Sequence, residues 1–418
     1  MNIGIIGSGG REHALCFKLK QSKIVDKIYC IPGNAGTNLI AENLDIETND
    51  FEKIKKISIE KKIELLVVGP EKPLVDGISD YFKDTNIKIF GPNKIASQLE
   101  GSKTFTKKLC KKYNIPTSKF DIFENKESAK KFLINSVFPI VIKADGLAAG
   151  KGVYICNNNS KASIAVDEIF DGRFGKAHCV LIEEFLKGEE MSYFIITDGK
   201  TFKTFQTAQD HKRVGEGDVG KNTGGMGAYS PSRLINNELQ NKINEKIIKP
   251  TLKGLDDLNC EYVGFLYVGL MIIENEPFLI EFNVRMGDPE TQVVIPRIKN
   301  DFVDIILKCV NNRIKEIELE IENRFATTVI LASNGYPKKY SKGDIISNLK
   351  EKNESIIFHA GTKLNDNNVV TNGGRVIACT GLGNDLNSAL NNSYDLAKSI
   401  SWNNKYYRKD IGKDLLKK

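Results

Sequence analysis

The first hundred residues alternate between apolar runs that favour strands and amphipathic runs that favour helices. The strand-like runs are "NIGIIG" (2–7), "KIYCI" (27–31), "IELLVVG" (63–69) and "KIFG" (88–91). The helix-like runs between them are "REHALCFKLKQS" (11–22) and "FEKIKKISIEKK" (51–62). Parallel strands need a crossover between them, usually a helix, so this alternation predicts a parallel α/β sheet at the start of the chain.

Length and composition exclude several classes of protein. The 418 residues allow two to four domains of roughly 100–200 residues each. No stretch approaches the ~18 uninterrupted apolar residues of a membrane helix, and "MNIGIIGSGGREH" does not resemble a signal peptide. The net charge of +7 comes without basic–aromatic interleaving. We therefore expect a cytoplasmic protein with no membrane or nucleic-acid partner.

The cysteines and histidines do not form a metal-binding pattern. The eight cysteines are scattered without a CxxC pair, and none of the four histidines has zinc-ligand spacing with them. The cysteines are predicted to be small buried apolar residues.

The segment "VIKADGLAAGKGVYI" (141–155) carries glycines and two lysines between two strand-like runs. It is not a Walker A loop, because only three residues separate Gly146 from Gly150 and Gly152, not Ser or Thr, follows Lys151. The segment is predicted to be a hairpin lid whose backbone N–H groups face phosphate oxygens, with Lys143 and Lys151 adding positive charge. The alternative is a flexible hairpin tip with incidental lysines.

Two glycine-rich turns occur in the first domain. In "GIIGSGGREH", Gly7 and Gly9 fit the dinucleotide fingerprint, but Glu12 stands where its third glycine belongs. The next strand ends in Pro32 and Gly33 and not in an acid, so NAD binding is not predicted. In "IPGNAGT", backbone donors and Asn34 are candidates for binding a small phosphate ester, with a simple tight turn as the alternative.

The segment "FLIEFNVRMGDPETQ" (278–292) places polar side chains in a buried strand. Glu281, Asn283 and Arg285 are two residues apart and share one face. A carboxylate and an amide oxygen suit magnesium, and an arginine beside them can hold a developing anion. The alternative, a surface strand of alternating charge, conflicts with the apolar residues that precede Glu281.

Residues 208–231, "AQDHKRVGEGDVGKNTGGMGAYSP", are predicted to form a long functional loop. Asp210, His211, Lys212 and Arg213 are candidates for contacts to anions or substrates. The alternative is a disordered surface loop.

These motifs occur in the order seen in ATP-grasp ligases: Lys103 in "EGSKTFTKK", Lys143 in "KADGLAAGKGV", then "IEEFLKGEEMS" and "IEFNVRMGDPETQ". Together with "GSGGREHAL", "GNAGT", "VVGPEKPLVDG", "QDHKR", "NTGGMGAYSP", "FHAGTK", "TNGGRV" and "YYRKDIG", they closely resemble the phosphoribosylamine–glycine ligase family over essentially the full length. "KADGLAAGKGV" indicates the superfamily, whereas "QDHKR", "NTGGMGAYSP" and "RMGDPETQ" point to this member.

The resemblance implies a multidomain α/β and α+β fold with three parts. Residues 1–102 would form an N-terminal substrate-binding domain and residues 103–323 an ATP-grasp domain, with a mobile lid at about 120–190. Residues 324–418 would form a small C-terminal domain. The implied reaction joins glycine to 5-phosphoribosylamine with ATP and Mg²⁺ (or Mn²⁺), an early step of purine synthesis. The protein is expected to be a monomer.

The resemblance also implies residue roles. Arg285, Lys143 and Asp210 would be catalytic, and Glu281 and Asn283 would bind the metal. ATP would be held by residues of three segments: Lys103, Lys143, Gly146, Gly150, Lys151, Gly152, Glu183, Phe185 and Glu190. The small substrates would meet residues of four motifs: Gly9, Asn34, Gly36, Thr37, Gly225, Met226, Gly227, Arg285, Asp288, Pro289, Glu290 and Thr291.

One position departs from the wider superfamily. Many ATP-grasp enzymes have a further acidic metal ligand on the preceding strand, and counting back from Glu281 places Gly269 there. The number of metal ions is therefore left open. The alternatives are another ATP-grasp enzyme, a nucleotide-binding regulator without turnover, and a nicotinamide oxidoreductase, which Glu12 disfavours.

Overall fold

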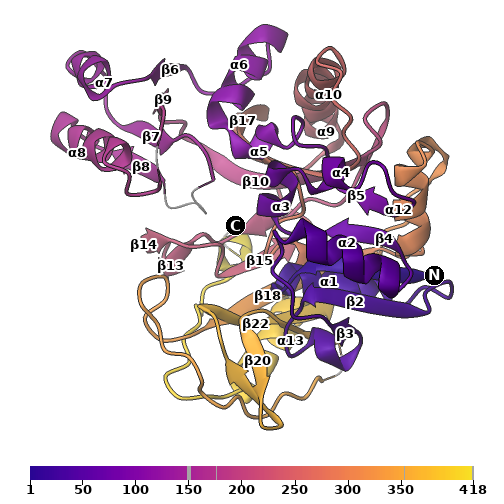
Figure 1. The fold of residues 1–418 in the computed structure, drawn as a ribbon. Coiled ribbons are helices and arrows are strands. Elements are labelled where there is room, and N and C mark those ends of the chain that lie inside the picture. The colour runs from indigo at the N-terminus through magenta and orange to yellow at the C-terminus, as the bar shows by residue number, and fades with distance from the viewer. Residues whose placement is uncertain (148–151, 176, 353, 417–418) are drawn as a thin grey trace.

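The computed structural model describes residues 1–147, 152–175, 177–352 and 354–416. Three sheets of four or five strands form the body, and a fourth stands apart at the upper left of Figure 1. Within the described residues, no helix combines the length and apolar character needed to cross a membrane. All eight cysteines are buried and unpaired, as predicted.

The chain begins with a five-stranded parallel sheet in the order β3-β2-β1-β4-β5, which confirms the first prediction. Its strands are β1 (Asn2–Gly7), β2 (Lys27–Pro32), β3 (Glu42–Asn43), β4 (Ile63–Val68) and β5 (Lys88–Phe90). The helices are α1 (Gly10–Leu19), α2 (Phe51–Glu60), α3 (Glu71–Asp76) and α4 (Ile78–Tyr81). The N-terminal end of α1 follows directly on the carboxyl end of β1, the edge where ligands bind in such sheets.

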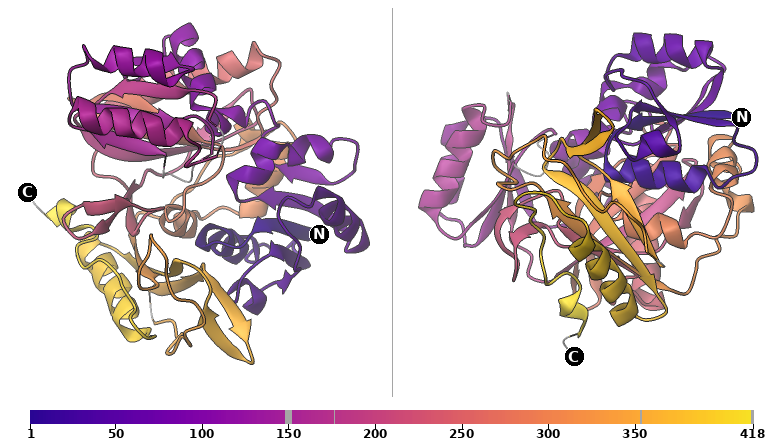
Figure 2. Two further views of the ribbon diagram at one scale, coloured as in Figure 1. Left: turned by 60° about the vertical axis from the view of Figure 1, so that its left-hand side comes forward. Right: turned by 90° about the horizontal axis from the view of Figure 1, so that it is seen from below.

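A separate antiparallel sheet in the order β6-β9-β7-β8 carries the glycine-rich hairpin. Its strands are β6 (Phe120–Phe123), β7 (Ile140–Ala144), β8 (Val153–Cys156) and β9 (Val180–Glu184). Helices α7 (Lys126–Leu133) and α8 (Asn159–Phe170) cover one face and share a small apolar core with it (Figure 2). The prediction that residues 141–155 form a hairpin between two strands is confirmed, because β7 and β8 pair antiparallel.

The central antiparallel sheet has the order β11-β10-β16-β17. Its strands are β10 (Glu189–Thr197), β11 (Phe202–Thr204), β16 (Gly264–Ile273) and β17 (Glu276–Asn283). The surrounding helices are α5 (Gln98–Gly101), α6 (Lys103–Tyr113), α9 (Asn237–Ile243), α10 (Lys249–Asp256) and α12 (Phe302–Val310). The short helix α11 (Thr291–Val294) packs against α1. Phe90 of the first sheet packs edge-on against Phe265, so one apolar core joins the two sheets.

The last sheet has the order β12-β15-β18-β22-β19, with α13 (Leu386–Ser399) packed against β18 and β22. Its strands are β12 (Gln209–Asp210), β15 (Gly227–Ser230), β18 (Phe325–Ala332), β19 (Ser355–His359) and β22 (Arg375–Gly383). Two hairpins extend from this part: β13 (Arg213–Gly215) with β14 (Val219–Asn222), and β20 (Thr362–Asn365) with β21 (Asn368–Thr371).

The prediction that residues 208–231 form one long loop is wrong. Four short strands lie in this segment, and β15 pairs with β18 from the distant C-terminal part. Gly217 and Asp218, which lie between β13 and β14, have positive φ angles that let the chain reverse there. Strands this short and rich in glycine show no apolar alternation, so the sequence pattern did not reveal them.

Candidate active site

A cavity of about 460 Å³ lies where the separate sheet, the central sheet, α1 and the C-terminal sheet approach one another. Twelve of the sequence-predicted site residues line it: Lys103, Lys143, Gly146, Gly152, Glu183, Glu190, Asp210, Glu281, Asn283, Arg285, Asp288 and Glu290. These residues are up to 187 positions apart in the chain (103 to 290), so the fold gathers them into one place.

The lysines at one end of the cavity surround Glu183. Lys143 on β7 and Lys107 on α6 place their Nζ atoms 3.0 and 3.1 Å from the Glu183 carboxylate. Ser118 donates a further hydrogen bond of 2.6 Å to it. Burial opposes ionisation of Glu183, but the two lysines outweigh it and hold its pKa below the usual value. The Glu183 carboxylate, predicted to meet the adenine edge, is therefore engaged with lysines in this structure.

The base of the glycine hairpin is tied to the start of α6. Asp145 accepts hydrogen bonds from the backbone N–H of Thr104 (3.1 Å) and from the Ser102 hydroxyl (3.2 Å). Lys103 donates a hydrogen bond of 2.9 Å to the Gly146 carbonyl oxygen, and burial lowers its pKa. A carboxylate at a helix N-terminus is stabilised by the unpaired backbone N–H groups there. Sequence reasoning missed this role of Asp145.

The alternation predicted for β17 agrees with the structure. Glu281 and Asn283 line the cavity, and Phe282 and Val284 belong to the apolar core, although Phe282 also touches the cavity wall. Gly269 of β16 lies directly opposite Glu281, as the count along the sequence predicted. Among the described residues, the side-chain oxygens of Glu281 and Asn283 have no hydrogen-bond or ion-pair partner. Two hard oxygen donors therefore face the cavity without direct contact to a protein cation, and the charge of Glu281 acts on the Lys103 ammonium group only through space.

Arg285 follows β17 and has acidic partners that the sequence did not reveal. Its Nη2 lies 2.7 Å from Glu100 Oε1, and its Nε lies 3.2 Å from Glu71 Oε2. Burial raises the pKa of Glu100 to about 7, against the opposing charge of Arg285. The only local signal for Glu100 was its position three residues before Lys103 in "EGSK".

A second group of charges surrounds Lys212. Its Nζ lies 2.5 Å from Glu190 and 3.4 Å from Asp210. Ser192 donates a hydrogen bond of 3.2 Å to Glu290. Burial and the charge of Asp210 raise the pKa of Glu290 to about 7, and burial likewise raises the pKa of Asp210. This end of the cavity thus carries several carboxylates around one ammonium group.

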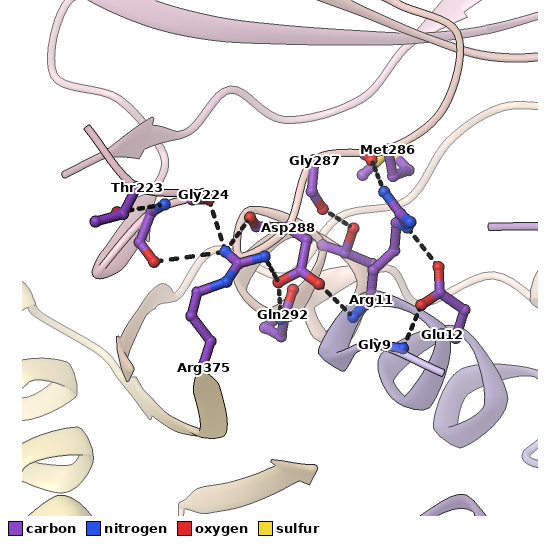
Figure 3. Close-up of polar contacts among 12 residues, drawn as sticks. Gly9, Arg11, Glu12, Thr223, Gly224, Met286, Gly287, Asp288, Gln292 and Arg375 are labelled. Atoms are coloured by element: carbon purple, nitrogen blue, oxygen red, sulfur yellow. Dashed lines mark hydrogen bonds and ion pairs between the residues drawn. The ribbon is translucent and has the colours of Figure 1, made fainter. Parts of the chain in front are cut away.

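Asp288 joins three parts of the chain (Figure 3). Its carboxylate accepts hydrogen bonds from the Arg11 backbone N–H (3.4 Å) and from Gln292 (2.9 Å), and it lies 3.4 Å from Arg375 Nη2. Arg375 Nη1 also donates to the carbonyl oxygens of Gly224 (2.6 Å) and Asp288 (2.5 Å). Arg11 and Arg375 both line the cavity and were not singled out from the sequence.

In the "GNAGT" turn, backbone N–H groups donate to the Asn34 side chain of the same turn. Asn34 Oδ1 accepts from the backbone N–H groups of Gly36 (2.8 Å) and Thr37 (3.0 Å). Asn34 Nδ2 donates to the carbonyl oxygens of Ser8 (2.8 Å) and His359 (2.9 Å). Asn34, Gly36 and Thr37 are buried and do not line the cavity. These contacts favour the alternative interpretation, a tight structural turn.

Several other predicted residues lie outside the cavity lining: Gly9, Phe185, Gly225, Met226, Gly227, Pro289 and Thr291. The Gly9 backbone N–H donates to Glu12 (2.6 Å) and is therefore already satisfied. Phe185 is partly exposed, and Met226 and Thr291 are fully buried. Gly150 and Lys151 lie outside the described residues.

Comparison with known proteins shows which family this chain belongs to. Residues 1–100, 101–291 and 326–414 match the N domain, the ATP-grasp (A) domain and the C domain of phosphoribosylglycinamide synthetase. A phosphoribosylamine–glycine ligase of Haemophilus influenzae is 47% identical over 420 residues, which cover 99% of this chain and 98% of the relative. One from Brucella melitensis is 46% identical over 417 residues, with coverage of 99% and 97%.

A solved structure agrees with these matches. The crystal structure of a phosphoribosylamine–glycine ligase from Thermotoga maritima shares 36% of its sequence with this chain, at a TM-score of 0.87. The alignment covers 98% of this chain and 100% of that one. The chain therefore belongs to the phosphoribosylamine–glycine ligase family of ATP-grasp enzymes.

Proposed function

We propose that this enzyme joins glycine to 5-phosphoribosylamine and cleaves ATP to ADP and phosphate, giving glycinamide ribonucleotide for purine synthesis. One observation carries the proposal: in a chain of this family, Lys103, Lys143, Glu281, Asn283 and Arg285 converge on one cavity. Such a set suits chemistry in which negative charge develops on phosphoryl and acyl oxygens.

The reaction proposed has two steps. The glycine carboxylate attacks the γ-phosphate of ATP, which forms glycyl phosphate and releases ADP. The amine of phosphoribosylamine then attacks the acyl carbon, loses a proton, and displaces phosphate. The enzyme would provide no covalent nucleophile, because positioning and charge stabilisation suffice for transfers of this kind.

Lys103 and Lys143 are proposed to hold ATP phosphates, and Arg285 the oxygens that gain charge. Glu281 and Asn283 are proposed to hold Mg²⁺ or Mn²⁺, because their unpartnered oxygens are the donor type that these ions prefer. A bound divalent ion supplies Lewis-acid stabilisation of phosphoryl oxygens. Among the described residues, no cluster of three or more His, Cys, Asp or Glu forms an all-protein metal site.

Residues at the other end of the cavity are proposed to receive the small substrates. Asp210 and Glu290 supply carboxylates suited to the ammonium group of glycine, and Lys212 limits their mutual repulsion. Asp288 remains a candidate contact for phosphoribosylamine because it lines the cavity near Arg11.

The three predicted domains, 1–102, 103–323 and 324–418, are retained as a proposed division. Within the second, the sheet β6-β9-β7-β8 is proposed to act as the lid, since it has a core of its own. A closing lid protects an acyl phosphate from water. Hydrogen exchange in the segment 144–152 is therefore expected to slow when magnesium and ATP are added. Unchanged exchange at saturating nucleotide would count against a phosphate-covering role.

The direct test is ADP release with glycine and freshly prepared phosphoribosylamine, with each substrate omitted in turn. ADP should form only when both are present. Turnover with alanine but not with glycine would remove the assignment. Phosphate release from ATP and bicarbonate would instead favour another ATP-grasp enzyme.

A further inference from the structure

Glu100 makes two contacts to the segment that follows β17. Its Oε1 lies 2.7 Å from Nη2 of Arg285, and its Oε2 accepts a hydrogen bond of 2.8 Å from the backbone N–H of Val284. The side chain is 7% exposed, so neither contact is exchanged freely for water. Both oxygens of one carboxylate are thus directed at consecutive residues of one segment.

The segment that Glu100 holds is central to the proposed site. Val284 lies between Asn283, a proposed metal ligand, and Arg285, the proposed oxyanion contact. The bond to the Val284 N–H fixes the peptide group that Asn283 shares with Val284. The ion pair fixes the guanidinium of a long side chain that otherwise has several rotamers.

Glu100 is also close in sequence to Lys103, the phosphate-binding candidate at the start of α6. It lies in α5, three residues before Lys103, and its charge is felt by the Lys103 ammonium group. It therefore connects the start of α6 with the end of β17 through one side chain.

We infer that Glu100 is a positioning residue: it fixes the guanidinium of Arg285 and the end of β17 relative to Lys103. This inference rests on the proposed ligase function. Glu100 acts through Arg285 and contacts no reacting atom.

The contacts of Glu71 distinguish it from Glu100. Glu71 lies 3.2 Å from Nε of Arg285, whereas the Val284 N–H donates its hydrogen bond to Glu100. Burial raises the pKa of Glu100 to about 7, and the neighbouring charge of Glu71 adds to this effect. Two carboxylates that share one guanidinium carry a desolvation cost, which is more often retained at functional sites than in ordinary cores. Glu100 is expected to matter more than Glu71, because it alone holds both side chain and backbone.

The experiment is a double-mutant cycle of Glu100→Gln and Arg285→Lys. Glu100→Gln keeps the size of the side chain and an acceptor for Val284, but it removes the charge that orients Arg285. Turnover should fall by roughly 10–100-fold, the usual effect of losing a group that orients a ligand-binding residue. The KM for ATP should stay near the wild-type value. The double variant should be no slower than Arg285→Lys alone, because the two residues act as one unit.

Controls separate positioning from general stability. Asp198 is another buried carboxylate that accepts backbone N–H groups, from Lys200 and Thr201, and it lies outside the cavity lining. Asp198→Asn should lower the melting temperature and leave turnover unchanged. Glu71→Gln should reduce turnover less than Glu100→Gln. If the effects of Glu100→Gln and Arg285→Lys on turnover multiply, or if Glu100→Gln lowers only the melting temperature, the inference is wrong.

A failure of the proposed function would give a different result from a failure of the inference about Glu100. Wild-type enzyme that releases no ADP with glycine and phosphoribosylamine would remove the function. The same cycle, measured by the free energy of unfolding, would still decide whether Glu100 and Arg285 are coupled. Additive effects on unfolding would reject the orienting contact, whereas coupling would retain it for whichever reaction the cavity performs.

Discussion

Two regions of this molecule resemble ligand-binding sites in sequence, but their polar groups are partnered differently in the structure. The first, the closed region, consists of the turns around Gly9 and Asn34 at the edge of the first sheet, whose backbone donors bind Glu12 and the Asn34 side chain. The second, the open region, is the central cavity beside Glu281 and Asn283. Among the described residues, these two side chains have no hydrogen-bond or ion-pair partner, and about 460 Å³ of space lies beside them. Glycine content alone therefore does not identify a ligand site. The decisive difference is whether donors and acceptors are satisfied within the protein.

The largest effect should come from the open region, at Glu281. Glu281→Gln keeps the size of the side chain and removes the charge proposed to bind the metal, so turnover should fall by roughly 10²–10³-fold, comparable to the loss of one stabilising contact. The metal concentration needed for half-maximal rate should rise. The melting temperature should stay constant, because Glu281 has no partner among the described residues. Steady-state rates at several magnesium concentrations, beside a melting curve, measure both.

Glu276 on the same strand provides the matched control. It pairs with Lys242 and Lys246 at the surface, and Glu276→Gln should leave turnover and metal requirement unchanged. Wild-type rates for Glu281→Gln would show that the open face of β17 is not the active site. Arg285→Lys is expected to lower stability as well as turnover, because Arg285 pairs with two carboxylates.

The closed region should respond in stability and not in substrate binding. Asn34→Ala removes an acceptor for two N–H groups and a donor to buried carbonyl oxygens, each costing about 1–3 kcal/mol when left unsatisfied. Water can reach some of these N–H and carbonyl groups and replace the lost hydrogen bonds. The free energy of unfolding should therefore fall by about 3 kcal/mol and not by the full sum. KM for phosphoribosylamine should stay near wild type. Denaturant unfolding and initial rates test the two halves of the prediction.

Asn38, exposed in the same turn, is the control, and Asn38→Ala should change neither quantity. A raised KM with unchanged stability for Asn34→Ala would restore the sequence-based prediction that this turn binds a phosphate ester.

The success of the sequence interpretation depended on the range of the interactions involved. Local periodicity was sufficient for the parallel strands of the first sheet, for the β7–β8 hairpin and for the shared face of Glu281 and Asn283. The family motifs added which segments converge on the cavity. Periodicity reports which face a residue occupies and not which distant segment covers it. The pairing of β15 with β18, and the carboxylates of Glu71 and Glu100 on Arg285, are long-range contacts of this second kind.

Short polar segments were the other source of error. The strands between residues 208 and 231 contain two to four residues each and lack an apolar stripe, so they resembled a loop. Asn34 shows the converse difficulty. A turn that binds a phosphate and a turn that binds its own asparagine have the same composition, and only the hydrogen-bond partners distinguish them.

Acid should destabilise the closed region through two histidines. His13 Nδ1 accepts a hydrogen bond of 2.8 Å from the backbone N–H of His359, and both rings are buried beside the Asn34 turn. Burial, with the charge of His359, lowers the pKa of His13 to about 3, and burial lowers the pKa of His359 to about 4. The unfolded chain takes up protons below about pH 6.5, whereas the native protein does not. Stability is therefore full above pH 6.5 and is lost as the pH falls towards 4.

At pH 5 the loss should be about 2 kcal/mol per histidine. Denaturant unfolding at pH 7 and pH 5 gives the difference. His13→Asn retains an acceptor near Nδ1 that cannot take up a proton. The stability that this variant loses between pH 7 and pH 5 should therefore be smaller than the wild-type loss by about the contribution of one histidine. An identical loss in this variant would mean that other groups dominate the acid response.

The smallest expected effect is the response to NAD, which should be none. A dinucleotide needs its pyrophosphate at the N-terminus of α1, where the third glycine of the fingerprint allows close approach. Here the Glu12 carboxylate accepts hydrogen bonds of 2.6 Å from the Gly9 N–H and from Arg11 Nε, so a negative charge already occupies this position. The strand β2 also ends at Pro32, is followed by Gly33, and offers no acid for the ribose hydroxyl. Calorimetry should therefore detect no binding at millimolar NAD, while the same sample binds ADP with magnesium.

Glu12→Gly should not create NAD binding, because the ribose contact is still missing. The variant should nevertheless be less stable, because the buried Arg11 loses its carboxylate partner. Micromolar binding of NAD by the wild-type protein would place a second nucleotide site at the first sheet, and the contrast between the closed and open regions would no longer hold.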